Sequence, residues 1–289
     1  MADNANKRIS DRKEGRLLRS LPAFARMAPF VMRRRSDAQC VLADSVEITE
    51  IEKWIREKRA EGWADLSFLH LMVAAYVRTV TMRPGINRFV AGRRIYARND
   101  IQIVFHVKRG MSVSATETTV KVTFAPSDTV FDVHRRVTEA IDAVKADVSA
   151  SEPERIAAGI LRLPRFVSRI VMAGLRWMDF HDLLPRRILD ASPFHASLNV
   201  TDLGSLGIIA ADTSVPDFGT LPCSVCFGAK RRVREGDTSD ARFVDYRLAV
   251  DQRIADAYYF SSALKCLKYF LKNPRLLELP PETIEDDVN

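Results

Sequence analysis

The sequence contains few cysteines, only four in 289 residues. That number is too small for a disulfide-stabilised scaffold, in which cysteines are dense. Cys223 and Cys226 form a C-x-x-C pattern, but they fall in an apolar run that predicts a strand. Residues three positions apart on a strand point to opposite faces, so we expect two buried thiols there and no redox pair or metal site.

Long apolar runs and targeting signals are also missing. No stretch of about 18 uncharged apolar residues occurs, so no transmembrane helix is expected. Residues 1–20 are polar and lack the apolar segment of a secretory signal peptide. The sequence therefore predicts a cytoplasmic protein.

Acidic residues are fewer than basic ones: the chain has 37 Asp and Glu and 44 Lys and Arg, which gives a formal net charge of +7. A basic balance can indicate nucleic acid, anionic lipid or a phosphate-bearing cofactor as a partner. No zinc-finger spacing, RNA-binding signature or basic zipper accompanies it, so no nucleic-acid partner is expected. Hydrophobic residues make up 47% of the chain, which predicts a globular protein with a large core.

Helix and strand signals are mixed along the chain without a regular alternation. Predicted strands lie at 41–48, 118–124, 197–201, 223–228 and 243–250, and a predicted hairpin joins 89–96 to 101–107. Predicted helices lie at 49–61, 66–82, 130–148 and 258–271. This order favours an α/β domain with a mixed sheet flanked by helices.

Two basic segments stand apart from this pattern. Residues 1–35 include the run Arg33-Arg34-Arg35 and predict a basic, solvated N-terminal arm before a domain at 36–289; an anion-binding role is the alternative. Residues 154–189 carry apolar positions at helical spacing, two prolines and seven arginines, and predict a helical insertion. We expect the insertion to cover the core, with its arginines spread around the helices and reaching water. A membrane-surface role is the alternative, but membrane contact is not expected.

Residues 251–257, with the sequence DQRIADA, are the most informative segment. They resemble the D-H-R-x-x-D-G motif of the 2-oxoacid dehydrogenase acyltransferases, whose catalytic fold is shared with chloramphenicol acetyltransferase. Asp251, Arg253 and Asp256 match the motif at its spacing. Gln252 occupies the place of the His, which is the general base in that family, and Ala257 occupies the place of the Gly.

Other segments extend the resemblance. Residues 198–207, LNVTDLGSLG, resemble the family's segment of strand, Ser or Thr, then Asn-Leu-Gly-x-x-Gly, with Thr201, Gly204 and Gly207 at the matching positions. Residues 82–87 resemble its P-x-x-N segment. The resemblance covers about residues 15–282. It includes no lipoyl domain or subunit-binding linker, so we expect a free-standing catalytic domain.

The resemblance implies a chloramphenicol-acetyltransferase-like fold and a homotrimer with active sites between subunits. It also implies transfer of an acyl group between CoA, or another thioester, and a thiol or hydroxyl acceptor. Thr201 would donate a hydrogen bond to the developing oxyanion, and Asp256 and Arg253 would hold the loop, Asp256 mainly through a charge pair. Coenzyme A or acyl-CoA is the implied ligand, and no metal is expected.

The replaced motif residues raise the question of the base. Gln252 cannot serve, because an amide does not titrate near neutral pH, and losing a general base typically costs about 10²- to 10⁴-fold in rate. Ala257 would be strained if its position requires a positive φ. His195 and His181 are the alternative bases, although His195 is expected to be a hydrogen-bonded structural histidine. A catalytically degenerate binding or assembly subunit on the same fold is the alternative function.

Overall fold

The computed structural model describes residues 11–108, 117–146, 152–232 and 241–289. Its centre is a mixed sheet in which β7 runs parallel to both neighbours and the other adjacent pairs are antiparallel. In spatial order its strands are β2 (Gln39–Glu47), β9 (Arg242–Asp251), β8 (Cys223–Arg232), β7 (Leu198–Asp202), β5 (Ile101–Lys108) and β6 (Glu117–Phe124). The predicted mixed α/β architecture is confirmed.

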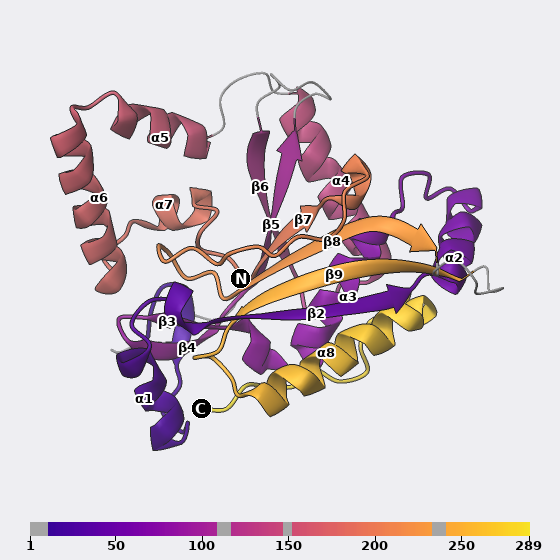
Figure 1. Ribbon diagram of the computed structural model, residues 1–289, viewed down its shortest axis with the longest axis horizontal. Helices are drawn as coiled ribbons and strands as arrows, with labels where there is room; N and C mark the ends of the chain where they lie inside the picture. Colours follow the sequence, from indigo (N-terminus) through magenta and orange to yellow (C-terminus); the bar gives the residue numbers. More distant parts are fainter. Residues whose placement is uncertain (1–10, 109–116, 147–151, 233–240) are drawn as a thin grey trace.

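Helices cover one face of this sheet, as Figure 1 shows for α3 and α8. They are α2 (Thr49–Ala60), α3 (Phe68–Met82), α4 (Val130–Ala146) and α8 (Ala257–Lys272). Helix α3 is apolar on nearly every side and is buried from His70 to Thr81, as expected for a helix inside a core. It begins after a capping box at Ser67 and ends before Pro84, which cannot continue the helix.

The opposite face of the sheet has a much smaller apolar cover. Val104 and Ala249 of the sheet pack there against Ala196, Val215 and Leu221 from the connecting segments. Two of these five residues are alanines, so this cover is a minor part of the core. On this face Asn199 and Thr201 are half-buried and His106 is exposed, whereas Ser224 is buried.

The predicted hairpin of 89–96 with 101–107 is wrong. Strand β3 (Arg88–Ala91) pairs with β4 (Arg94–Arg98), which also pairs with β1 (Gly15–Leu17), in a separate small sheet. The turn lies at Gly92 and Arg93, with φ of 55° and 58°. Two residues at positive φ make the tight turn that suits a twisted hairpin, and Gly-Arg is a weak sequence signal for it. Strand β5 joins the large sheet instead.

The described part of the N-terminal segment combines packed residues, such as Leu18 and Arg35, with an exposed stretch around α1 (Ala23–Val31), so only part of it resembles the expected solvated arm. The segment also contains β1. Arg12 and Arg35 are buried, and they form ion pairs with Asp179 at 3.3 Å and with Asp251 at 3.4 Å. Residues 1–10 lie outside the described residues, and the domain boundary at 35 remains a prediction.

The helical insertion consists of α5 (Glu152–Leu161), α6 (Arg165–Phe180) and α7 (Arg186–Ala191). Helices α5 and α6 stand beside the sheet instead of over it (Figure 1). The side of α6 that carries Phe166, Ile170 and Trp177 faces solvent, with these residues 67%, 66% and 59% exposed. The expectation that this part of the insertion covers the core is therefore wrong.

No described helix combines the length and the apolar content that crossing a membrane requires.

Candidate functional site

The turn after β9 is fixed by buried charges. Asp251 is the last residue of β9 and is fully buried. Its Oδ1 accepts hydrogen bonds from the backbone N–H of Arg253 (3.1 Å) and from Nε of the same residue (2.8 Å), and its Oδ2 accepts one from Nη2 (2.7 Å). Arg253 also donates to the backbone carbonyl of Met32. Arg35 is the second arginine beside Asp251. Its pKa is lowered because the side chain is buried, and the nearby Asp251 carboxylate offsets part of this effect.

Asp256 and Ala257 form the start of α8. Asp256 is the N-cap residue, and its Oδ1 accepts a hydrogen bond from the backbone N–H of Tyr259 at 2.7 Å. Among the described residues Asp256 forms no ion pair, so the capping bond takes the place of the expected charge pair. Ala257 is the first helical residue and is not at positive φ, so the expected strain is absent.

Gln252 and Thr201 are not brought together within one chain. The side chain of Gln252 is exposed, and its backbone N–H donates to the carbonyl of Ala38. In the sheet, Thr201 pairs with Cys226, which pairs with Arg247, and Gln252 follows Arg247 by five positions. At about 3.3 Å per residue, this offset is roughly 16 Å along the strands, in addition to two steps between strands.

The segment after Thr201 has a shape that requires its glycines. Asp202 Oδ1 accepts a hydrogen bond from the backbone N–H of Ser205 at 2.9 Å, which closes a short turn. A Cβ on Gly204 would lie 2.6 Å from the carbonyl oxygen of Gly228, and Gly207 has φ of 72°. Thr201 is half-buried at the end of β7, and burial raises the pKa of the adjacent Asp202 carboxyl.

A histidine that sequence reasoning passed over lies beside Thr201. The parallel register of β5 and β7 pairs Phe105 with Val200, and continuing it by one residue sets His106 opposite Thr201. His106 is exposed, and its Nε2 lies 2.9 Å from Oδ1 of Asn199. Because that oxygen only accepts, Nε2 carries a hydrogen in this contact. Only the register across strands about ninety residues apart reveals this proximity.

A cavity of about 420 Å³ opens beside this segment, and we refer to it as the basic cavity. Asp202, Gly204 and Ser205 line one side of it, whereas Thr201, one position before Asp202 on β7, faces the other side of the sheet and does not line it. Its remaining lining combines apolar walls with cations, including Ile51, Ile55, Phe68, Phe227, Arg56, Arg59, Lys230 and Arg242. Four cations and two carboxylates line the cavity, and one of the carboxylates, Glu52, accepts from both Lys230 and Arg242. The cavity therefore suits a ligand that is apolar at one end and anionic at the other.

The two histidines proposed from the sequence lie elsewhere. His195 is buried, with Nδ1 at 2.8 Å from Oγ of Ser192 and Nε2 at 3.3 Å from Oδ1 of Asp179. This arrangement is typical of a structural histidine. His181 ends α6, where its ring contacts those of Trp177 and Phe180.

Glu14, Asp179 and His195 are close enough to hold a metal ion together. However, Arg98 lies 3.1 Å from Glu14, and Arg12 lies 3.3 Å from Asp179. The two carboxylates are thus already neutralised by arginines, and adding a divalent cation would leave an uncompensated buried charge. The cluster fits an ion-pair network better than a metal site.

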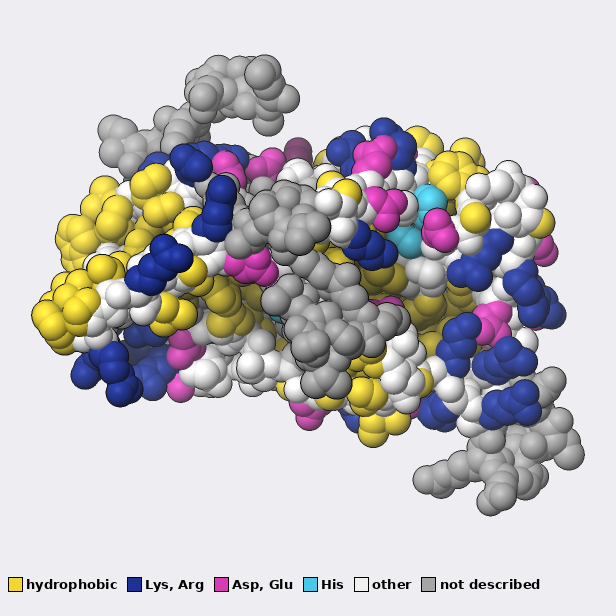
Figure 2. All heavy atoms as spheres, turned by 90° about the horizontal axis from the view of Figure 1, so that it is seen from above, with side chains coloured by type: hydrophobic (Ala, Val, Ile, Leu, Met, Phe, Trp, Pro, Cys, Tyr) yellow, Lys and Arg dark blue, Asp and Glu magenta, His cyan; other side chains and the backbone are white. Residues whose placement is uncertain are grey.

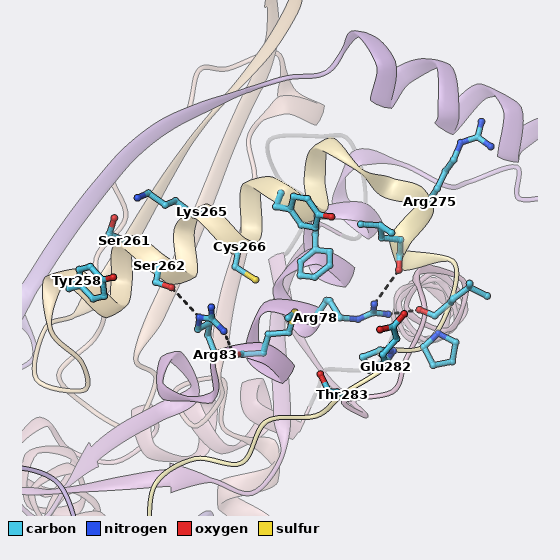
Figure 3. Close-up of a pocket in the computed structure, with 17 residues that line it drawn as sticks. Arg78, Arg83, Tyr258, Ser261, Ser262, Lys265, Cys266, Arg275, Glu282 and Thr283 are labelled. Carbon is cyan, nitrogen blue, oxygen red and sulfur yellow. Dashed lines mark hydrogen bonds between the residues drawn. The ribbon is translucent and has the colours of Figure 1, made fainter.

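The largest cavity described, about 670 Å³, lies between α8 and the C-terminal segment (Figure 3). Arg83 donates to Oγ of Ser262, and Arg78 donates to the carbonyls of Leu276 and Leu279. Arg78 therefore fixes the C-terminal segment against α3, and Arg83 joins the end of α3 to α8. Thr201 and Gln252 do not line this cavity, and it is a packing seam rather than the candidate site.

No family model matches the sequence, and no curated protein matches it. Solved structures do resemble the fold. A probable dihydrolipoamide acetyltransferase from Listeria monocytogenes 4b F2365 is 14% identical over 88% of this chain and 94% of its own, with a TM-score of 0.56. Chloramphenicol acetyltransferase is 13% identical over 89% of this chain and 99% of its own, with a TM-score of 0.57. The cubic core of the pyruvate dehydrogenase multienzyme complex is 13% identical over 91% of this chain and 94% of its own, also with a TM-score of 0.57.

The chain thus has the fold of acyltransferase catalytic cores, as its resemblance to that family implied.

Proposed function

We propose that this protein binds an acyl thioester of CoA and transfers the acyl group to a thiol or hydroxyl acceptor. The observation that carries this proposal is the basic cavity at the turn that follows Thr201, on a fold shared with two named acetyltransferases. The cations of the cavity suit the phosphates of CoA, and its apolar walls suit the arm that leads to the sulfur.

The chemistry assigns distinct tasks to few residues. A base removes the proton from the acceptor thiol or hydroxyl, whose lone pair then attacks the thioester carbonyl carbon. The hydroxyl of Thr201 donates to the oxyanion that forms, a neutral donor aimed at developing charge. As the tetrahedral intermediate collapses, the C–S bond breaks and the CoA sulfur leaves with the proton that the base returns.

Gln252 cannot act as that base, and His106 is the residue of this chain best situated to replace it. The register of β5 and β7 sets His106 opposite Thr201, and Asn199 orients its ring. Histidine is the side chain that most often serves as a general acid or base in enzymes. Asp256 acts through the start of α8, which it caps.

The test is turnover of acetyl-CoA with a panel of small thiol and hydroxyl acceptors, together with CoA binding by calorimetry. Wild type is expected to bind CoA and to show turnover above background. Thr201→Val should lower the rate by about 10²- to 10³-fold and Thr201→Ser by much less. His106→Gln should lower it by about 10²- to 10⁴-fold. Absence of both CoA binding and turnover would contradict the proposal.

A homotrimer with the site between subunits is part of the proposal, because the resemblance to the acyltransferase family implies it, and Gln252 of one chain lies far from its own Thr201. Assembly of similar folds into a cubic core supports self-association of this fold. A cytoplasmic location also remains a prediction.

The second candidate function is a non-catalytic binding or assembly subunit. It is favoured by the exposed Gln252 at the position of the family's base. This candidate predicts CoA binding without turnover, and substitution of His106 would then change nothing measurable.

A further inference from the structure

A cavity of about 520 Å³ lies at the end of the molecule that carries α1, the β3–β4 turn and α6, and we refer to it as the arginine cavity (Figure 1). Six arginines line it. Arg35 and Arg253 are buried and paired with Asp251. Arg33, Arg34, Arg93 and Arg176 are exposed, and none of these four has a carboxylate partner among the described residues.

The acids that line this cavity do not neutralise the exposed arginines. Asp179 pairs with Arg12, and Asp217 accepts hydrogen bonds from the backbone N–H and the hydroxyl of Ser36. Four guanidinium groups directed at one space repel each other, and an anion placed among them turns that repulsion into attraction. Guanidinium groups also match the geometry of phosphate oxygens.

The backbone at Arg93 is unfavourable for its residue type. Its φ of 58° lies in the left-handed region, where a side chain costs free energy that Gly would not. The preceding Gly92 shares this conformation. Strain of this kind often marks a residue kept for its side chain, and Arg93 borders two cavities at once.

The second of these cavities, about 620 Å³, runs beside α1, and we refer to it as the apolar cavity. Its walls include Leu17, Met27, Phe30 and Ile95. The guanidinium of Arg93 lies over the ring of Phe30, 5.9 Å from its centre, at the border with the arginine cavity. A cavity lined by arginines and an apolar cavity thus adjoin, which is the arrangement that an amphipathic anion requires.

Apolar side chains continue from both cavities onto the surface. Phe24 and Val31 of α1 are among the most exposed residues of their type, and α6 exposes Phe166, Ile170 and Trp177. Figure 2 shows hydrophobic and basic side chains gathered together at the end of the molecule drawn on the left, where α6 lies in Figure 1.

The arginines of α6 are arranged beside this apolar stripe. At about 100° per residue, Arg165, Arg169 and Arg176 fall within an arc of roughly 40°, which corrects the expectation that they spread around the helix. Phe166, Ile170 and Trp177 fall in a neighbouring arc of similar width. A basic edge beside an exposed apolar stripe is typical of helices that lie in a membrane interface.

We propose that this end of the protein binds the surface of a membrane that contains anionic phospholipid. The phosphate-bearing headgroup occupies the arginine cavity, an acyl chain lies in the apolar cavity, and the stripe of α6 enters the boundary between headgroups and acyl chains. A second copy of the chain fits less well, because the arginine cavities of two copies would repel each other. This inference does not depend on acyl transfer.

The experiment is co-sedimentation of the full chain with vesicles at physiological salt. One set of vesicles is phosphatidylcholine alone, and the other is phosphatidylcholine mixed with phosphatidylglycerol. We expect binding to the mixed vesicles only. A variant with Arg33→Gln, Arg34→Gln and Arg93→Gly should bind about a hundredfold more weakly, at roughly fivefold for each arginine. Arg93→Gly suits the φ at that position, so the turn is retained.

The control variant removes the same charge elsewhere, with Lys265→Gln, Lys272→Gln and Arg275→Gln, and should bind as wild type does. A second variant changes Phe166, Ile170 and Trp177 to Ser and should also lose binding. Its control changes the exposed Tyr258 and Tyr269 to Ser. Circular dichroism checks that every variant is folded.

Three results would overturn the proposal. The first is no binding of wild type to the mixed vesicles, or equal binding to both kinds. The second is vesicle binding that both variants retain. The third is binding of inorganic phosphate or glycerol phosphate in solution without vesicle binding, which would identify a soluble anion as the ligand. Light scattering is measured on the same samples. If the variants change the molecular mass but not vesicle binding, a second copy of the chain occupies this surface and the proposal is wrong.

Discussion

Asp251 and Arg253 form a bidentate ion pair across two residues at the end of β9, with distances of 2.8 Å (Nε to Oδ1) and 2.7 Å (Nη2 to Oδ2). Arg35 approaches the same carboxylate from the segment after α1. The turn is thus tied to the N-terminal segment by charge and keeps its shape although Gln252 and Ala257 replace the residues of the family motif. None of these ion pairs involves position 252, so the shape of the turn does not depend on the histidine that the family has there.

Replacing Asp251 should therefore destabilise the fold strongly. In Asp251→Ala, Arg35 and Arg253 are left buried without a counter-charge, which typically costs about 3 to 5 kcal/mol. Urea unfolding followed by circular dichroism measures the loss. Asp245→Ala is the matched control, because its pair with Arg231 is exposed and should contribute less than about 1 kcal/mol. Similar losses for both variants would contradict this prediction.

If the second candidate function holds and the wild-type site lacks a base, Gln252→His should raise the rate of acyl transfer. The turn already has the shape that holds this position, so the new imidazole needs no rearrangement of Asp251 or Arg253. A restored general base is expected to increase turnover by about 10²-fold or more, measured as release of free CoA thiol. Gln252→Asn should leave the rate unchanged. A wild-type rate that Gln252→His does not alter would show that the base acts from another position, with His106→Gln as the decisive comparison.

The protein should be a trimer in solution. The resemblance to the acyltransferase family implies a trimer with its sites between subunits, and one chain separates Thr201 from Gln252 by two strands and five positions. Light scattering coupled to size exclusion should give three times the chain mass of 32.6 kDa. A stable monomer at micromolar concentration would contradict this prediction and the inter-subunit site together.

Acid should destabilise the protein through His70. Burial and the neighbouring His134 lower the pKa of His70 to about 3, whereas an unfolded histidine titrates near 6.5. Between these values only the unfolded chain binds the proton, so the free energy of unfolding falls as the pH drops below about 6.5. Near pH 4.5 this contribution amounts to about 2 to 3 kcal/mol.

His70→Gln tests this prediction with little change at the helix start. The imidazole Nδ1 accepts a hydrogen bond from the backbone N–H of Ser67 in a capping box, a role that a Gln side chain also performs. Urea unfolding between pH 4.5 and 7.5 should show a smaller loss of stability in the variant than in wild type. Equal slopes with pH would assign the acid sensitivity to other groups.

Local sequence patterns predicted most of the secondary structure correctly, because each signal lies within a few residues. Helix α3 is an apolar run ended by Pro84, and α8 begins where Asp256 caps it. Together with the motif segments at 198–207 and 251–257, these signals indicated the fold that the solved structures share. The small hairpin was missed because its turn at Gly92 and Arg93 depends on backbone angles that the residue names barely specify.

What the sequence by itself determined is the fold class and the absence of a histidine at position 252. Tertiary structure alone decided which groups meet. The register of parallel strands sets His106 beside Thr201, and His195 is buried against Asp179 although it lies in the same segment as Thr201. Tertiary structure also leaves α6 standing outside the core with an apolar side exposed. Such pairings depend on chain packing over long sequence separations, whereas sequence periodicity reports only which face of an element is apolar.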